Sequence, residues 1–317
     1  MHLIWTEVIS QVLKMGRGIF RLLILKKSLL LLEYLCMNFL KVINLITIQQ
    51  AVNNFKLLIE QAIEEDGNVG KTAMIRSSQP ILNLHEAVKT QLINNGVNSS
   101  LIYPPLGTRR PEIKLAGALK QKNQDICILP NNINLENEVL LTGLLEGVID
   151  PYGIKSTNRI LTINVRSQIS SIQKNFDTLY ERIIFEAQNL HERCPEIVLG
   201  EMYMIAVPEY DDREFKNNTI KFRNVSPALV KKYIKSFKAI SGRRKTDKNF
   251  FQYEASCLLI VDFSKNPPKI YTSTSELIQK GLLDEDTDVH YEGLGWNDFI
   301  ANLISAYENR FGIGSLS

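Results

Sequence analysis

Aspartate at the start of an expected strand is the residue in this sequence best placed to hold a metal ion. Asp125 directly precedes the apolar run 126–129, so a strand there would hold its carboxylate at the edge of a sheet. Carboxylate oxygens are the ligands that Mg²⁺ prefers, and a bound metal can activate water for hydrolysis. An aspartate at a strand start is also a common turn or capping residue. Both interpretations of Asp125 stay open at this stage.

A row of polar residues alternates with aliphatic ones between residues 160 and 169. Asn164, Arg166 and Gln168 share one face of the expected strand, and Lys174 follows near the start of the next helix. A row of this kind points either into solvent or into a site. In a site, its side chains could stabilise the charge of a phosphate.

Two further acids are candidates for a second metal ligand. Asp150 lies fourteen residues before Asn164, and Glu86 lies on an expected helix. Each has a simpler interpretation, because Asp150 precedes a proline in a turn and Glu86 could be an exposed helical acid. The triplet at residues 112–114 has the pattern Glu-x-Lys, and we expect it on the surface.

Positive charge is concentrated between residues 213 and 248. This segment has twelve lysines and arginines against two acids, although the net charge of the whole chain is only +3. Residues 230–240 predict a helix with one apolar and one cationic face, and an arginine-rich loop follows. Phosphate contacts and readout of base edges are expected from Lys231, Lys235, Lys238, Arg243, Arg244 and Lys245. On charge alone, a merely solvated helix is the alternative.

The elements around these residues predict a mixed α/β fold, in which helices flank a central mixed β-sheet. Hydrophobic periodicity predicts helices over 39–63, 80–95, 172–190, 230–240 and 296–311, and strands over 112–119, 124–129, 160–169, 197–207 and 257–263. The polar residues 120–123 are expected to form the turn between the first two strands. We expect residues 37–317 to form a single domain with a helical part (37–100), a catalytic sheet core (110–210) and the basic segment (213–248).

The composition is that of a globular protein, with 44% hydrophobic and 22% charged residues. Four widely separated cysteines indicate reduced thiols and a cytoplasmic protein rather than disulfides or zinc ligands. Charged residues interrupt the apolar stretch 18–48, so it lacks the run of about 20 apolar residues that a membrane span needs. We therefore expect no membrane partner, although an anchor is the alternative. The globular pattern begins at Met37, which makes residues 1–36 a non-native or disordered extension.

Three blocks of sequence make the chain resemble type II restriction endonucleases of the PD-(D/E)xK superfamily. They are residues 120–128, 163–171 and 174–182, and the resemblance covers roughly 75–312. In that superfamily an Asp on one strand and an (Asp/Glu)-x-Lys on the next bind Mg²⁺ and orient water, with a helix packed behind. Asp125 matches the first position. Asn164-Val165-Arg166 stands at the second and departs from the pattern at both its acid and its lysine.

The resemblance implies a restriction-endonuclease-like core and Mg²⁺-dependent hydrolysis of phosphodiester bonds at a short site in double-stranded DNA. It also implies a homodimer, with a cognate DNA methyltransferase as genetic partner. Asp125 would hold the metal, Arg166 and Gln168 would contact the scissile phosphate, and Asn164 would assist. Gln168 or Lys174 could compensate for the departure, or Asp150 or Glu86 could supply the second carboxylate. A non-catalytic DNA-binding or regulatory protein is the alternative that the departure favours.

Overall fold

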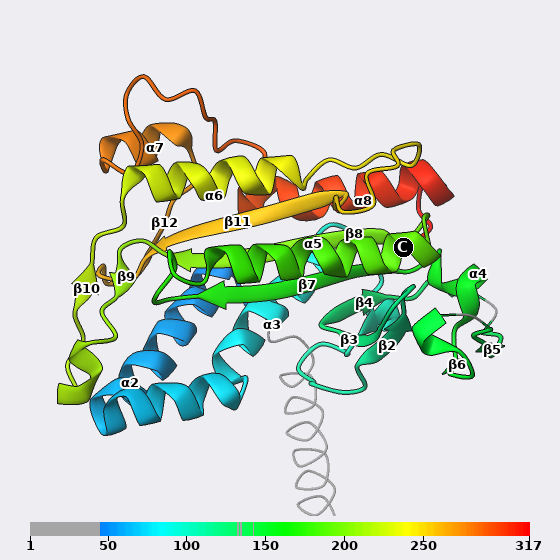
Figure 1. Ribbon diagram of the computed structural model, residues 1–317, viewed down its shortest axis with the longest axis horizontal. Helices are drawn as coiled ribbons and strands as arrows, with labels where there is room; N and C mark the ends of the chain where they lie inside the picture. Colours follow the sequence, from blue (N-terminus) through cyan, green and yellow to red (C-terminus); the bar gives the residue numbers. More distant parts are fainter. Residues whose placement is uncertain (1–44, 132, 134, 142) are drawn as a thin grey trace, which may run out of the picture. The chain divides into compact units, whose positions relative to one another are not determined.

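A six-stranded mixed sheet forms the centre of the fold (Figure 1). The computed structural model describes residues 45–317 except 132, 134 and 142, and the predicted extension 1–36 lies outside that range. The strand order is β1 (Ile102–Tyr103), β4 (Ile126–Ile128), β7 (Leu161–Gln168), β8 (Val198–Ala206), β11 (Ala255–Asp262) and β12 (Lys269–Ile270). The β7–β8 and β8–β11 pairs are parallel, and the other pairs are antiparallel. The predicted mixed α/β class is confirmed.

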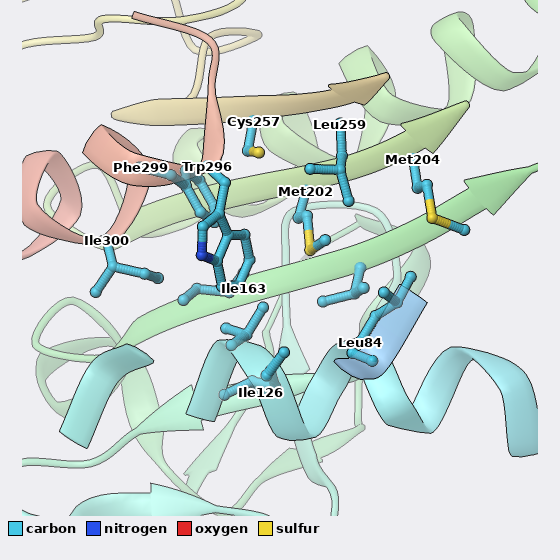
Figure 2. Close-up of a cluster of buried hydrophobic side chains, with 14 of the residues drawn as sticks. Leu84, Ile126, Ile163, Met202, Met204, Cys257, Leu259, Trp296, Phe299 and Ile300 are labelled. Carbon is cyan, nitrogen blue, oxygen red and sulfur yellow. The ribbon is translucent and has the colours of Figure 1, made fainter. Parts of the chain in front are cut away.

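Helices cover both faces of this sheet, and each face has its own hydrophobic core. One core includes apolar residues from α2 (Ile48–Arg76), α3 (Gln79–Asn94) and α8 (Trp296–Phe311). Figure 2 shows part of it, with Met202 and Leu259 of the sheet near Trp296 of α8. The other core includes residues from α5 (Phe176–Arg193), α6 (Pro227–Ala239) and α7 (Thr274–Gln279). Burial of apolar side chains on both faces explains why the central strands are continuous hydrophobic runs.

Shorter elements connect these layers. Three are two-stranded hairpins, formed by β2 (Ile113–Ala116) with β3 (Gln121–Gln124), β5 (Glu138–Val139) with β6 (Ile149–Asp150), and β9 (Glu209–Tyr210) with β10 (Phe222–Arg223). The others are single turns of helix, η1 (Ser99–Leu101), η2 (Gly143–Leu145), α4 (Gly153–Thr157) and η3 (Glu214–Asn217). No helix in the described range is both long enough and apolar enough to cross a membrane.

Two predicted boundaries differ from the structure. Asp66 and Gly67 leave helical geometry, as expected, but α2 resumes after them and ends at Arg76. Residues 121–124 form strand β3 rather than a turn, and the turn lies at residues 117–120. Asn189 of α5 accounts for the second difference, because its side chain bonds to Leu119 and to Lys120 and fixes the turn there.

Gly200 of β8 has almost no room for a larger side chain. A Cβ there would lie 2.6 Å from Cδ1 of Leu303 and 3.2 Å from Cγ1 of Ile163, and both of those residues are fully buried. We expect Gly200→Ala to lower the free energy of unfolding by about 1–3 kcal/mol because it overpacks the core. Urea titration of the two proteins measures the difference. Gly295→Ala is the matched control, since no atom of the described residues lies within 4 Å of a Cβ at that position. An equal effect of the two substitutions would contradict the overpacking argument.

Candidate functional site around Asp125

Asp125 lies where strands β4 and β7 part. The two strands pair from Ile128 opposite Leu161 to Ile126 opposite Ile163, and β7 runs on to Gln168 past the end of this pairing. Oδ2 of Asp125 accepts a hydrogen bond from the backbone N–H of Val165 at 2.8 Å. The carboxylate is therefore held at the fork between the strands by a backbone group.

A hollow of about 410 Å³ opens beside this carboxylate. Its charged and ionisable lining residues are His85, Lys89, Arg109, Arg110, Glu112 and Asp125. Glu112 accepts a hydrogen bond from Nδ2 of Asn123 at 2.7 Å, which ties it to the β2–β3 hairpin. Two carboxylates, one histidine and three cationic side chains thus line one hollow, and carboxylates beside cations are the group types that bind a metal ion and a phosphate.

His85 brings a group to this hollow that could accept a proton. Its Nε2 is buried and has no hydrogen-bond partner among the described residues. Burial lowers the pKa of His85 below the ordinary value of 6.5, even though the charge of Asp125 acts in the opposite direction. Burial thus favours the neutral form of the imidazole, in which one ring nitrogen can accept a hydrogen bond.

Glu86 and Lys89 shape the loop beside the hollow. Glu86 forms an ion pair with Lys89 at 2.7 Å and accepts a hydrogen bond from the N–H of Gly107, also at 2.7 Å. Nζ of Lys89 also donates to the carbonyls of Pro105 and Thr108. Glu86 thus anchors the loop directly through Oε2 and indirectly through Lys89, which its Oε1 holds. Although the sequence suggests it as a metal ligand, it is not among the residues that line the hollow.

The polar row on β7 lies under helix α5 instead of facing an opening. Val165 lines the hollow, so Asn164 and Arg166, its neighbours along the strand, point to the opposite face. Asn164 is only 2% exposed, and Gln168 accepts hydrogen bonds from the hydroxyls of Tyr203 and Tyr233. The expected contacts of Arg166 and Gln168 with the scissile phosphate would require both side chains to leave the protein partners that they have here.

Arg166 is the centre of a buried ion-pair network. Its guanidinium binds Glu201 of β8 and Glu186 of α5, and Glu186 also binds Lys122 at 2.6 Å. Burial alone would lower the pKa of Arg166, but these two carboxylates outweigh it and raise that pKa. Burial raises the pKa of Glu201 to about 7 against the opposing effect of Arg166. Arg166 therefore stays protonated and connects two strands and a helix.

Asp150 and Lys174 are separate from Asp125. Asp150 is fully buried, and its Oδ2 accepts a hydrogen bond from Nη1 of Arg193 at 2.6 Å, while Oδ1 accepts one from the N–H of Tyr152. The partners of Asp150 give it a structural role in place of the predicted metal-binding one. Lys174 lines a different hollow, together with Arg213 and Arg223. Within the described range, no three His, Cys, Asp or Glu side chains are grouped so that they could hold a metal ion.

Glu112 and His85 belong to the site although the sequence did not single them out for it. The signal for Glu112 was the β2–β3 hairpin, in which Ile113 pairs with Gln124. Glu112 directly precedes this pair, accepts a hydrogen bond from Asn123 and lines the same hollow as Asp125. Glu112 is exposed, as expected for the Glu-x-Lys triplet, and it also lines the hollow beside Asp125.

The basic face of α6 is partly neutralised by an acidic loop. Lys231 and Lys235 share one carboxylate, that of Asp288, at 2.5 and 3.0 Å. Lys238 donates a hydrogen bond to the carbonyl of Glu292. These lysines are on the surface, as expected, but each already has an anionic or carbonyl partner that DNA would have to replace.

Arg243, predicted as a DNA contact, is buried in the structure. It is 2% exposed, and its guanidinium donates to Glu254 at 2.9 Å and to the carbonyl of Pro195 at 2.9 Å. It cannot contact DNA from this position. Arg244 and Lys245 remain accessible, with the side chain of Arg244 85% exposed and Lys245 paired to Glu196 at the surface.

A scan of the chain against models of known protein families found no match, and comparisons with curated proteins and with solved structures found none either.

Proposed function

We propose that this chain is a type II restriction endonuclease that hydrolyses phosphodiester bonds at a short specific site in duplex DNA with the help of Mg²⁺. The observation that supports this most strongly is the position of Asp125. Its carboxylate is fixed at the fork of two strands beside a hollow that also contains Glu112, His85 and three cationic side chains.

The chemistry of the donor set fits Mg²⁺. This ion keeps several waters and needs only one or two protein carboxylates, which Asp125 and Glu112 would provide. Bound there, Mg²⁺ would supply Lewis-acid activation of water and phosphate. In this proposal His85 would accept the proton of the attacking water, and Arg109 and Arg110, which line the same hollow, would neutralise the phosphate.

The topology around Asp125 supports the same proposal. Asp125 precedes β4, the next sheet strand is the antiparallel β7, and α5 then leads to β8, parallel to β7. In Figure 1, α5 lies across β7 and β8. An aspartate strand, a neighbouring strand and a helix packed behind are the arrangement that the resemblance implies. On this proposal the enzyme acts in the cytoplasm as a homodimer, and a cognate DNA methyltransferase protects the host.

Incubation of the purified chain with plasmid DNA and Mg²⁺ tests the proposed function. Discrete fragments that require Mg²⁺ would support a site-specific endonuclease. The alternative, a non-catalytic DNA-binding or regulatory protein, is favoured by the Asn164-Val165-Arg166 departure and by the burial of Asn164 and Arg166. A gel shift without cutting in either Mg²⁺ or Mn²⁺ would favour that alternative.

Arg244 and Lys245 are expected to provide phosphate contacts. The double substitution Arg244→Ala/Lys245→Ala should weaken DNA binding by about tenfold and lower the slope of log affinity against log salt by about 2, since each phosphate contact releases a counterion. Fluorescence anisotropy at several salt concentrations measures both quantities. Arg76→Ala/Lys265→Ala removes the same charge from two other exposed positions and serves as the control. Equal losses from the two double variants would mean that only the net charge matters.

A further inference from the structure

Lys89 is a buried cation that holds the loop at residues 105–110 against helix α3. Its side chain is 1% exposed, and lysine is almost never buried this far without partners. An ammonium group has three N–H donors. Here Oε1 of Glu86 at 2.7 Å and the carbonyls of Pro105 and Thr108 at 3.2 and 3.1 Å accept all three. The side chain of Lys89 therefore uses its full donor capacity to attach the loop to α3.

Glu86 completes this attachment from one turn earlier in α3. Its Oε2 accepts a hydrogen bond from the N–H of Gly107 at 2.7 Å. Within the loop, the hydroxyl of Thr108 lies at hydrogen-bond distance from two carbonyls, that of Pro105 at 2.8 Å and that of Arg110 at 3.2 Å. The attachment thus continues along the backbone from Pro105 to Arg110.

Arg109 and Arg110 are the residues that this fixed loop brings to the hollow beside Asp125. Both are exposed, and both line the hollow. Among the described residues neither guanidinium has an ion pair or a hydrogen bond, although the carboxylates of Asp125 and Glu112 line the same hollow. Two neighbouring guanidinium groups without a protein partner present the donors that suit a phosphate group.

We infer that Lys89 and Glu86 are positioning residues, which fix the loop at residues 105–110 so that Arg109 and Arg110 bind a backbone phosphate of DNA at the hollow. This inference rests on the proposed function for the identity of the ligand. A loop that is ordered before binding does not lose conformational entropy when the ligand arrives, so the attachment raises affinity. Lys89 and Glu86 act through the arginines, because Lys89 has no donor left and the charge of Glu86 would repel a phosphate.

Binding of a short fluorescent DNA duplex in EDTA, where no metal-dependent cleavage interferes, tests the inference. Fluorescence anisotropy at several salt concentrations measures the affinity and the slope of log affinity against log salt. Arg109→Ala/Arg110→Ala should weaken binding by about tenfold and lower the slope by about 2, because two phosphate contacts are lost. Lys89→Met should weaken binding by about fivefold or more and lower the same slope, although its own side chain is buried.

A double-mutant cycle distinguishes positioning of the arginines from general support of the fold. If Lys89 acts through them, Lys89→Met should change the affinity by less than about twofold in a protein that already carries Arg109→Ala/Arg110→Ala. Equal losses in the two backgrounds would overturn the inference. So would the absence of any loss when Lys89→Met is the only change.

Lys56→Met is the matched control for the removal of a partly buried lysine. The side chain of Lys56 is 13% exposed, pairs with Glu60 at 2.7 Å and donates to the carbonyl of Phe263, and it is not among the residues that line the hollow. Its removal should leave the affinity for the duplex within about twofold. A loss as large as that of Lys89→Met would overturn the inference, since the effect would not depend on the loop.

Proteolysis without DNA tests the attachment of the loop by itself. Trypsin cleaves after arginine, and the Arg109–Arg110 bond lies in the loop. Lys89→Met should raise the rate of cutting at this bond by about tenfold, and the milder Glu86→Gln by about threefold, because a loosened loop opens to the protease more often. Unchanged rates for both variants would overturn the inference. Glu86→Gln keeps the test decisive if Lys89→Met does not fold.

Plasmid cleavage in Mg²⁺ separates this inference from the proposed function. If the affinities and the rates of proteolysis change as expected and DNA is not cut, the positioning roles stand and the endonuclease proposal fails. If DNA is cut, and Lys89→Met binds and cuts it as well as the unmodified protein does, the inference fails and the endonuclease proposal stands. Failure of the unmodified protein to bind the duplex would also overturn the inference.

Discussion

Asp125→Asn is expected to lower the rate of DNA cleavage by about a thousandfold or more while it changes DNA affinity by less than about tenfold. Removal of a metal-binding carboxylate costs several kcal/mol of transition-state stabilisation, and about 4 kcal/mol corresponds to a thousandfold loss of rate. The affinity for DNA depends mainly on cationic side chains that this substitution leaves in place.

Asparagine is the right replacement because it preserves the structural role of Asp125. The backbone N–H of Val165 needs an acceptor at the end of the β4–β7 ladder, and the amide oxygen of the substituted side chain would still provide one. Single-turnover cleavage of a plasmid and a parallel gel shift measure the two effects. Asp286→Asn, at an exposed position, is the control for loss of one negative charge. Retained cleavage by Asp125→Asn would remove Asp125 from the catalytic centre and would contradict the proposed function.

The strands and helices around the site could be predicted because their hydrophobic periods are regular. Alternation over residues 160–169 indicated a strand, and β7 spans Leu161–Gln168. It also put Asn164, Arg166 and Gln168 on one face. It could not show that helix α5 covers this face, since the period of a strand separates its two faces and carries no information about what packs on either of them.

The register of the β2–β3 hairpin was the second feature that could not be predicted from the sequence. Expecting the turn at residues 120–123 instead of 117–120 shifts the pairing of β2 with β3 and removes Glu112 from the neighbourhood of Asp125. The actual turn depends on Asn189, about seventy residues away in the sequence. Local turn propensity cannot include a tertiary hydrogen bond of this kind, which overrides it.

The charge pattern predicted a surface position for Arg243, which is buried, and the reason is again a tertiary contact. Arg243, Arg244 and Lys245 are adjacent in the sequence and look alike as a basic run. Only Arg243 is buried, because its guanidinium forms an ion pair with the buried carboxylate of Glu254. A count of charges treats every arginine as solvated and cannot distinguish an exposed cation from one that holds the interior together.

Glu254 is the centre of a buried ion-pair network that includes Arg243 and Arg310. Removal of its charge is expected to have the largest effect on the free energy of unfolding. Glu254 is fully buried with Arg243 and Arg310 as ion-pair partners, His191 lies 3.6 Å away, and the N–H of Leu199 donates to it at 2.6 Å. Glu254→Gln leaves two buried arginines without a carboxylate. We expect the free energy of unfolding at pH 7 to fall by about 3–5 kcal/mol, the cost of breaking a buried ion pair from one side.

The pH dependence of this loss distinguishes the ion pairs from simple packing. Burial would raise the pKa of Glu254, but His191 and Arg310 outweigh it and lower the pKa from its ordinary value of 4.5 to about 2. A carboxylate with a lowered pKa stabilises the folded state fully above pH 4.5, and this contribution, about 3 kcal/mol, disappears as the pH falls through 2. The unmodified protein should therefore lose its advantage over Glu254→Gln between pH 4.5 and pH 2.

Urea titrations of the two proteins at several pH values between 2 and 7 measure this convergence. Glu285→Gln, at an exposed position, should differ little from the unmodified protein at any pH and controls for the change of charge. A constant difference between Glu254→Gln and the unmodified protein across the range would mean that the glutamate contributes through shape and hydrogen bonds alone. Convergence would instead show that the negative charge of Glu254 stabilises its buried partners, among them Arg243, whereas its sequence neighbours Arg244 and Lys245 stay at the surface.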